Sequence, residues 1–256
     1  MKLGVCTDWT EAETLKTAGF DFIELNVQAH LIPLEGEAAF TPVLATIRSS
    51  SLPALAANGF LPGSLKVTGP TVDIELLTAY AETACRRAGQ AGLKTIVFGS
   101  GGARQVPDGF DRATAWRQLV DFGKAVAPIA TRHGITVVTE PLNRRECNIL
   151  NSVGECARLV REVNHPGLRL LVDAYHWLVD ADSADDLVSA APLLAHAHIA
   201  TGATRKAPGL EPCDFASFFQ ALRRGGYDGL LSVEGGWNNL AADAPIVLAV
   251  IRGMSK

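Results

Sequence analysis

The chain has 256 residues, of which 48% are hydrophobic and 20% are charged, and its formal net charge is −4. This composition is typical of a globular protein with a large buried core. A net negative charge without a long run of Lys or Arg argues against binding to nucleic acid or to an anionic membrane surface.

The sequence carries neither an apolar membrane segment nor a signal peptide, and we therefore expect a cytoplasmic protein. No stretch approaches 18 uninterrupted apolar residues, and the N-terminal segment MKLGVCTDWTEAE turns acidic where a signal peptide would need an apolar region. The five cysteines are scattered and include no CxxC pair. They therefore indicate neither a disulfide framework nor a zinc knuckle, and we expect them to be reduced.

Short apolar segments alternate with amphipathic ones almost to the end of the chain, which is the pattern of repeated βα units. The predicted strands are Leu3–Thr7, Phe22–Asn26, Ala54–Gly59, Thr95–Phe98, Ile135–Glu140, Leu168–Asp173, Ala195–Ile199 and Leu230–Glu234. Apolar residues at three- and four-residue spacing predict helices at Ile74–Ala91, Ala113–His133, Val153–Val163, Phe215–Arg224 and Ala244–Ile251.

Eight such units without a break in composition predict an α/β fold, a (β/α)8 TIM barrel that forms a single domain over residues 1–256. The structural rival is an open doubly wound sheet. That fold would want a glycine-rich fingerprint directly after the first strand, where the chain reads Thr7-Asp8-Trp9-Thr10. We therefore prefer the barrel.

The last four predicted strands each carry a side chain that can bind metal at or near the C-terminal end: Glu140, Asp173, His198 and Glu234. In a barrel these ends meet at one mouth. Three carboxylates crowded there would raise one another's pKa, and a divalent cation would remove the repulsion. The set suits Mn²⁺, with Mg²⁺, Co²⁺ or Zn²⁺ as alternatives. Any one acid could instead cap a strand or pair with a loop arginine, but four at consecutive strands favour the metal.

The histidines divide into candidates and background. His196 and His198 lie two apart and face the same side of a strand, so one can bind metal while the other packs behind it. His176 lies just beyond the sixth strand, where it could bind a substrate hydroxyl or remain a surface loop residue. The others are expected to be structural or solvated: His30, His133 and His165.

Four motifs stand out together: Glu140-Pro141-Leu142-Asn143 with Glu146; Asp173-Ala174-Tyr175-His176; His196-Ala197-His198 followed by Arg205-Lys206-Ala207-Pro208-Gly209; and Val233-Glu234. With these motifs, nearly the whole chain resembles the xylose-isomerase-like family of TIM barrels, particularly its ketose 3-epimerase and hydroxypyruvate-isomerase branches. The resemblance implies one divalent metal ion, usually Mn²⁺, with these ligands: Glu140, Asp173, His198 and Glu234. It implies that Glu140 and Glu234 also transfer protons. It implies these substrate-binding residues: Glu146, His176 and Arg205.

The resemblance further implies a homo-oligomeric sugar isomerase or epimerase acting on a ketose or a related keto-sugar. A metal bound to a carbonyl oxygen and the neighbouring hydroxyl acidifies the C–H bond between them and stabilises the cis-enediolate that forms. Return of a proton to the opposite face of the same carbon gives an epimer, and return to the neighbouring carbon gives an aldose–ketose isomer. The sequence leaves both outcomes open.

Three other functions remain as alternatives. A dehydratase acting on a keto-sugar or keto-inositol would need almost the same site, because proton abstraction beside a carbonyl also begins a β-elimination. An endonuclease-IV-like DNA repair enzyme shares the barrel but would need more metal ligands and a basic surface. A barrel that has lost activity and only binds a partner is the third.

Three features have weaker assignments. The segment Phe98–Arg104 predicts a tight loop that faces the substrate, in which Arg104 would contact a hydroxyl or phosphate, although its spacing is not that of a P-loop. Glu24 could reach the mouth or serve as the partner of a loop. Trp9 could stack on a sugar face or anchor a loop.

Overall fold

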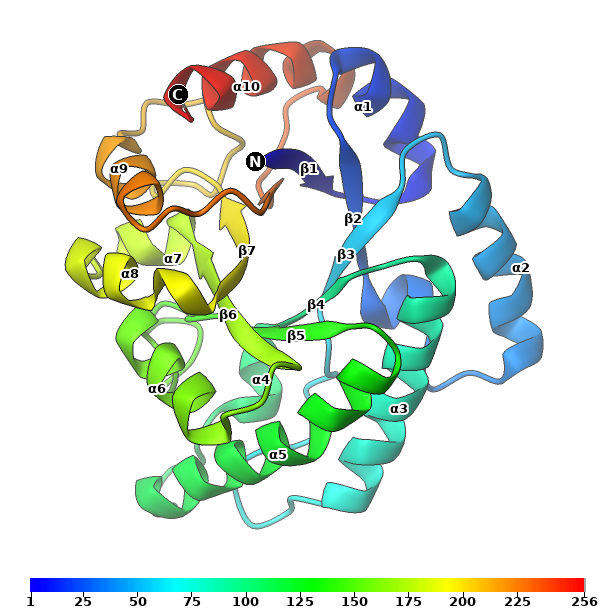
Figure 1. The fold of residues 1–256 in the computed structure, drawn as a ribbon, viewed down its shortest axis with the longest axis vertical. Helices are drawn as coiled ribbons and strands as arrows, with labels where there is room; N and C mark the ends of the chain where they lie inside the picture. Colours follow the sequence, from blue (N-terminus) through cyan, green and yellow to red (C-terminus); the bar gives the residue numbers. More distant parts are fainter. Residues whose placement is uncertain (256) are drawn as a thin grey trace.

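The computed structural model describes residues 1–255 and closes eight parallel strands into a barrel in chain order, with β8 pairing with β1. The strands are β1 (Lys2–Cys6), β2 (Phe22–Asn26), β3 (Ala54–Asn58), β4 (Thr95–Phe98), β5 (Thr136–Thr139), β6 (Leu168–Asp173), β7 (Leu194–Ile199) and β8 (Leu230–Val233). Figure 1 shows the strands at the centre of a ring of helices. All eight begin and end within one residue of the predicted bounds, so the TIM barrel prediction is confirmed.

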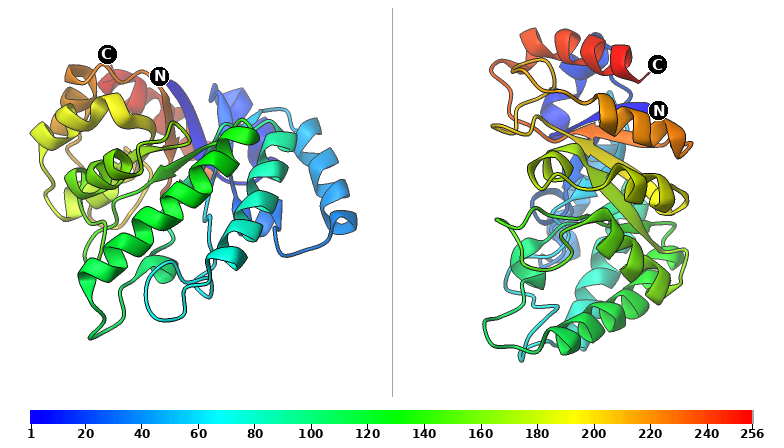
Figure 2. Two further views of the ribbon diagram at one scale, coloured as in Figure 1. Left: turned by 60° about the horizontal axis from the view of Figure 1, so that its bottom comes forward. Right: turned by 90° about the vertical axis from the view of Figure 1, so that its left-hand side faces the viewer.

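The outer ring consists of helices that follow the strands and surround the barrel (Figure 2). Its members are α1 (Ala12–Ala18), α2 (Glu37–Ser49), α3 (Ile74–Ala91), α5 (Arg112–Arg132), α6 (Val153–Val163), α8 (Ala184–Ala190), α9 (Ala216–Arg224) and α10 (Leu240–Met254). Shorter elements lie in the connections: η1 (Trp9–Glu11), η2 (Val27–Leu31), α4 (Gly101–Arg104), α7 (Ala174–Val179) and η3 (Ala191–Leu193).

Local sequence sets the ends of the longer helices. At the start of α3, the Asp73 carboxylate accepts the N–H of Leu76 at 3.0 Å, which satisfies a donor that the first turn leaves free. At its end Gly92 adopts a left-handed conformation with φ 89°, which costs glycine little. These two signals explain why α3 has the bounds that the periodicity predicts.

The barrel interior holds a small apolar layer beneath the mouth. Val97, Val138 and Leu171 are fully buried and pack together there. Val138 and Leu171 each lie two residues before an acid at a strand end, Glu140 and Asp173, and so share its inward face. The inward direction of both carboxylates therefore follows from strand alternation. A larger core lies between the strands and the helices.

Candidate active site

Side chains from four strands converge at the C-terminal mouth of the barrel. One possible ligand atom from each lies within 4.8 Å of the others in this group: Glu140, Asp173, His198 and Glu234. His198 Nδ1 lies 3.4 Å from Glu140 Oε1 and 3.5 Å from Glu234 Oε2. Barrel closure thus brings together the four residues that the sequence predicts to bind metal.

The donor set fits a divalent cation. Glu140 Oε1, Asp173 Oδ2 and His198 Nδ1 are buried and have no hydrogen-bond partner among the described residues, an arrangement that is costly unless something else pairs with them. Asp173 uses its other oxygen, Oδ1, to accept the N–H of Tyr175 at 2.9 Å at the start of α7. Capping therefore accounts for one oxygen of Asp173 and leaves the second available to a metal. Carboxylate oxygens with one imidazole suit Mn²⁺ and similar ions.

The carboxylates of the cluster have divergent pKa values. Burial, with repulsion from Glu234 and Glu140, raises the pKa of Asp173 to about 7. Burial also raises the pKa of Glu140. Burial opposes ionisation of Glu234 too, but attraction to His198 and Arg205 outweighs it and lowers the Glu234 pKa to about 2. The repulsion that the sequence predicts is therefore present, and a cation would relieve it.

Glu24, in the middle of β2, is the site residue that sequence reasoning left undecided. It is 1% exposed, and its carboxylate lies 2.7 Å from His196 Nε2 and 3.0 Å from His198 Nε2. An ionised carboxylate only accepts hydrogen bonds, so we assign a proton to Nε2 of both rings. Burial opposes ionisation of Glu24, but His198 and His196 outweigh it and hold the Glu24 pKa well below its usual value. His198 is thereby left with Nδ1 facing the carboxylate cluster.

Arg205 links the cluster to the substrate side of the mouth. Its Nη2 lies 2.6 Å from Glu234 Oε2 and 3.7 Å from Asp173 Oδ2, and its Nη1 lies 3.6 Å from Glu146 Oε1. The guanidinium carbon lies 4.5 Å from the centre of the Tyr175 ring, a cation–π distance. Two predicted substrate-binding residues, Arg205 and Glu146, therefore lie side by side next to the cluster of Glu140, Asp173, His198 and Glu234.

The third predicted substrate-binding residue, His176, is 3% exposed, which excludes its reading as a surface loop residue. Its Nδ1 accepts the N–H of Asn143 at 3.0 Å, so we assign the ring proton to Nε2, which is buried without a partner. Burial, together with the Arg205 charge, lowers the His176 pKa to about 3 and keeps the ring neutral. Asn143 also donates to Glu146 Oε1 at 3.0 Å. Asn143 was not among the predicted site residues, although it lies three residues from both Glu140 and Glu146 in the sequence.

Arg104 does not face the substrate, so that expectation is wrong. Its guanidinium is 0% exposed and donates to the carbonyl oxygens of Phe98 at 2.9 Å and of Glu140 at 2.6 Å. It holds the ends of two neighbouring strands together. Gly99, directly after β4, makes room for the Glu140 carboxylate. A Cβ at this position would lie 2.1 Å from Glu140 Oε2.

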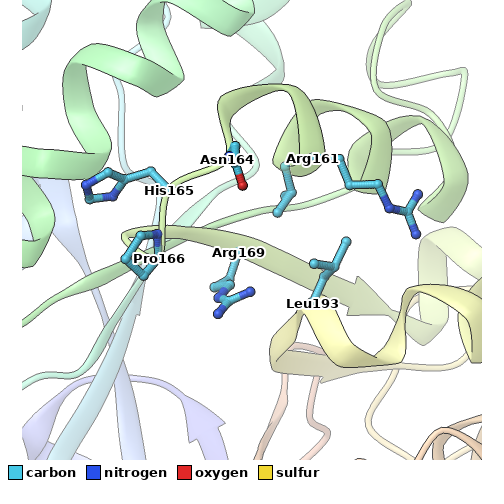
Figure 3. Close-up of a pocket in the computed structure, with 7 residues that line it drawn as sticks. Arg161, Asn164, His165, Pro166, Arg169 and Leu193 are labelled. Atoms are coloured by element: carbon cyan, nitrogen blue, oxygen red, sulfur yellow. The ribbon is translucent and has the colours of Figure 1, made fainter.

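Two pockets lie at opposite ends of the barrel. The pocket in Figure 3 lies near the start of β6 and includes Arg161, Asn164, His165, Pro166, Arg169 and Leu193. It contains none of the predicted site residues. The other lies at the mouth, along the ends of β1 to β3, and includes Glu24 in its lining. The chemistry of the strand ends therefore identifies the mouth as the candidate site.

Comparison with known proteins places the chain in a family. The family model described as xylose isomerase-like TIM barrel matches residues 12–252. The chain therefore belongs to the xylose isomerase-like TIM barrel family.

Several relatives within the curated proteins are epimerases. The chain is 31% identical to 3-dehydro-D-guloside 4-epimerase of Escherichia coli over 46% of its length and 45% of that protein. It is 34% identical to ketose 3-epimerase of Arthrobacter globiformis over 46% of each. The chain thus spans about half the length of these relatives. A longer match, 29% identical over 87% of this chain and 77% of the relative, is to D-psicose 3-epimerase of Agrobacterium fabrum.

Solved structures share the fold. The chain superposes on D-psicose 3-epimerase from Clostridium cellulolyticum, in a structure with D-tagatose, with a TM-score of 0.86 and 20% identity over 100% of each chain. For 3-keto-D-glucoside 4-epimerase from E. coli the TM-score is 0.82 at 24% identity, over 99% of each chain. Among residues 1–255, no helix has the length and apolar character needed to cross a bilayer.

Proposed function

We propose that this protein is a divalent-metal-dependent isomerase, in particular an epimerase, of a ketose or a related keto-sugar. One observation carries the proposal. Two carboxylates, Glu140 after β5 and Glu234 after β8, approach one point from strands that β6 and β7 separate, beside buried ligand atoms that lack partners. The epimerase relatives support the same class of reaction.

In this proposal the two glutamates act from opposite faces of the substrate, as inversion of a carbon centre requires. A divalent cation held by the four-residue cluster would polarise the carbonyl and hydroxyl oxygens of the substrate and acidify the C–H bond between them. One glutamate removes this proton, and the other supplies a proton to the opposite face of the same carbon. In the reverse reaction Glu140 and Glu234 exchange roles. We infer that the ion is Mn²⁺, since oxygen donors dominate the set.

Three further side chains orient the substrate in this proposal. Neutral His176 presents its Nε2–H as a donor, and the guanidinium of Arg205 presents a cation to the developing negative charge. Glu146 accepts a hydrogen bond from a substrate hydroxyl, and Asn143 holds the Glu146 carboxylate in place by donating a hydrogen bond to it. The sequence also predicts a cytoplasmic location, and the family resemblance predicts assembly into a homo-oligomer. Both predictions await experiment.

The test is incorporation of solvent deuterium. With Mn²⁺ in D₂O, the protein should place deuterium at the reacting carbon of a free ketose such as D-psicose, D-tagatose or L-ribulose and form its epimer without loss of water. Glu140→Gln and Glu234→Gln should each lower turnover by roughly a hundredfold or more, the usual size of general acid–base catalysis. Glu75→Gln, on the exposed side of α3, is the matched control.

Each alternative function has its own outcome in the same experiment. Appearance of a dehydrated diketone would identify a dehydratase and overturn the epimerase proposal. Deuterium transfer to the neighbouring carbon with formation of an aldose would identify an aldose–ketose isomerase. Cleavage of abasic-site DNA with no exchange into any ketose would favour the DNA repair reading, and metal binding without any reaction would favour an inactive barrel.

A further inference from the structure

A third pocket, of about 430 Å³, lies between α5 and α6, and none of the predicted site residues lines it. Its lining comes from the first two turns of both helices and from the segment that joins β5 to α6. It includes Arg112, Trp116, Arg117, Ile149, Glu155 and Arg158. The charged residues of this lining are three arginines and one glutamate, so the pocket is basic in a chain whose net charge is −4.

Arg158 is held in a fixed position before any ligand arrives. Its Nε donates to Glu162 Oε1 at 2.7 Å, and its guanidinium carbon lies 4.1 Å from the centre of the Trp116 ring. Trp116 Nε1 donates to the other oxygen of the same carboxylate, Glu162 Oε2, at 2.8 Å. The two terminal nitrogens of Arg158 make no hydrogen bond within residues 1–255. They can therefore bind a ligand at a low entropic cost.

The other two arginines of the pocket have no carboxylate partner in the described part of the chain. Arg112 Nη2 donates to the carbonyl oxygen of Asn148 at 2.8 Å, and Arg117 Nη2 donates to the hydroxyl of Thr114 at 2.7 Å. A guanidinium group has five N–H donors, so most of these donors stay free. Because two unpaired cations line one pocket, an anion that contacts both would be stabilised there.

Two residues of the same lining hold a segment that also reaches the candidate active site. Glu155 Oε2 accepts the backbone N–H of Asn151 at 2.8 Å, and the Asn151 side chain donates to the carbonyl oxygen of Leu142 at 2.8 Å. Arg112 binds this segment through the carbonyl contact described above. The segment from Leu142 to Asn151 carries Glu146, one of the predicted substrate-binding residues.

We propose that this pocket binds a small dianion of the phosphate type, such as a phosphate monoester, through Arg112, Arg117 and Arg158. A phosphate monoester carries close to two negative charges above neutral pH and three acceptor oxygens, which suits three guanidinium groups. The bound dianion would hold Arg112 in place and so fix the segment from Leu142 to Asn151. A net negative protein charge disfavours a long polyanion as the ligand. The inference does not depend on the proposed reaction.

Calorimetric titration of the Mn²⁺-loaded protein with methyl phosphate tests the site. At about pH 8 methyl phosphate is a dianion, and trimethyl phosphate, its neutral analogue, should bind at least about tenfold more weakly. Arg117→Gln and Arg158→Gln should each weaken methyl phosphate binding about tenfold, the effect of losing a hydrogen bond to a charged group.

The matched control is Arg161→Gln, which removes the same charge from the same helix as Arg158. Arg161 lies in the last turn of α6 and lines the pocket of Figure 3. It should therefore change the affinity for methyl phosphate by less than about twofold, since it acts only through screened, long-range charge.

A second variant tests whether the site is built rather than merely basic. Trp116→Leu leaves every charge in place but removes the ring under Arg158 and the donor to Glu162. Methyl phosphate binding should weaken about threefold, the effect of one cation–π contact at an exposed site. An unchanged affinity in this variant would overturn the role of Arg158 as a positioned donor.

Hydrogen exchange measured by mass spectrometry tests the effect on the segment. Methyl phosphate at ten times its Kd should slow exchange in the peptide that covers residues 142–151 at least about threefold, as binding to the ordered form requires. Chloride at equal ionic strength should leave the exchange unchanged. In Arg112→Gln the amide can still donate to Asn148, but the free donors are lost, so the slowing should disappear.

The outcomes separate this inference from the proposed function. Equal affinities for the two phosphates, or equal losses of affinity in Arg158→Gln and Arg161→Gln, would overturn the anion site. Methyl phosphate that binds at the metal instead would be insensitive to both Arg117→Gln and Arg158→Gln, which also overturns it. Unchanged exchange in the saturated protein would overturn the effect on residues 142–151. None of these results depends on whether a ketose incorporates deuterium.

Discussion

At the scale of single residues, Glu24 is the positioning residue of the proposed metal centre. Its two oxygens accept from His196 and His198, and it approaches His198 from the side opposite to the carboxylate cluster. A glutamine here would offer only one oxygen, so it could satisfy only one of the two Nε2–H donors. The orientation and tautomer of His198 therefore depend on a negative charge that lies behind it.

Glu24→Gln should weaken Mn²⁺ binding roughly tenfold to a hundredfold, the usual effect of losing the partner of a metal-binding histidine. Calorimetric titration of the metal-free protein gives the affinity, and ¹⁵N chemical shifts of the histidine rings should show a change of tautomer at His198 or His196. Glu13→Gln, on α1, serves as the exposed control. A folded Glu24→Gln protein with unchanged Mn²⁺ affinity would contradict the positioning role.

At the scale of elements, the ends of β5 and β8 decide where the two glutamates lie. Glu140 and Glu234 each come one residue after the end of the assigned strand. The backbone N–H of Glu140 nevertheless donates to the carbonyl oxygen of Phe98 at 3.2 Å, and that of Glu234 donates to the carbonyl oxygen of Ile199 at 3.1 Å. Both residues therefore remain aligned with the neighbouring strand. Pro141, which has no N–H to donate, then ends the pairing of β5.

Gly99→Ala should weaken metal binding at the proposed centre while having a smaller effect on the stability of the fold. The new Cβ would lie 2.1 Å from Glu140 Oε2, so the carboxylate must move away from its present position. We expect Mn²⁺ affinity to fall about tenfold or more, in the range seen when the surroundings of a ligand are altered. Gly36→Ala is the control, since a Cβ there meets nothing within 4 Å. Equal Mn²⁺ affinity in both variants, measured by titration, would show that Glu140 tolerates the shift.

The regular elements and the short connecting elements differ in how far sequence predicts them. Strands such as Phe22–Asn26 and Leu168–Asp173 are short apolar runs bounded by breaks in pattern, so their bounds follow from local sequence. The elements η2 and α7 carry no periodic pattern. They depend on tertiary or local contacts, with Arg87 anchoring η2 and Asp173 capping α7. For the same reason Arg104 was misassigned, because its carbonyl partners come from separate segments.

At the scale of the whole molecule, barrel closure concentrates charge from distant parts of the chain, and this gives metal binding a pH dependence. Burial and neighbouring carboxylates raise the pKa of Asp173 to about 7, and burial raises that of Glu140. Burial opposes protonation of His198, but Glu24 and Glu234 outweigh it and raise the His198 pKa. A metal ion binds these side chains only in their deprotonated forms, so protons compete with the ion more strongly as the pH falls.

We therefore expect the apparent affinity for Mn²⁺ to be about tenfold weaker at about pH 6 than at about pH 8, the effect of one competing proton with a pKa of about 7. Titration in two buffers with different ionisation enthalpies would count the protons released on binding. An affinity that does not change over this range would mean that the cluster is already deprotonated.

The sequence by itself determined the barrel and the four residues at its mouth, because strand alternation and the common direction of parallel strands send these side chains to one place. Tertiary structure alone decided which groups stand behind them. Glu24 meets His196 and His198 across 172 and 174 residues of chain, and His30 and Asp8 come to border one pocket. No local pattern encodes such pairs, since they exist only after closure of the barrel brings side chains of β2 and β7 together in its interior.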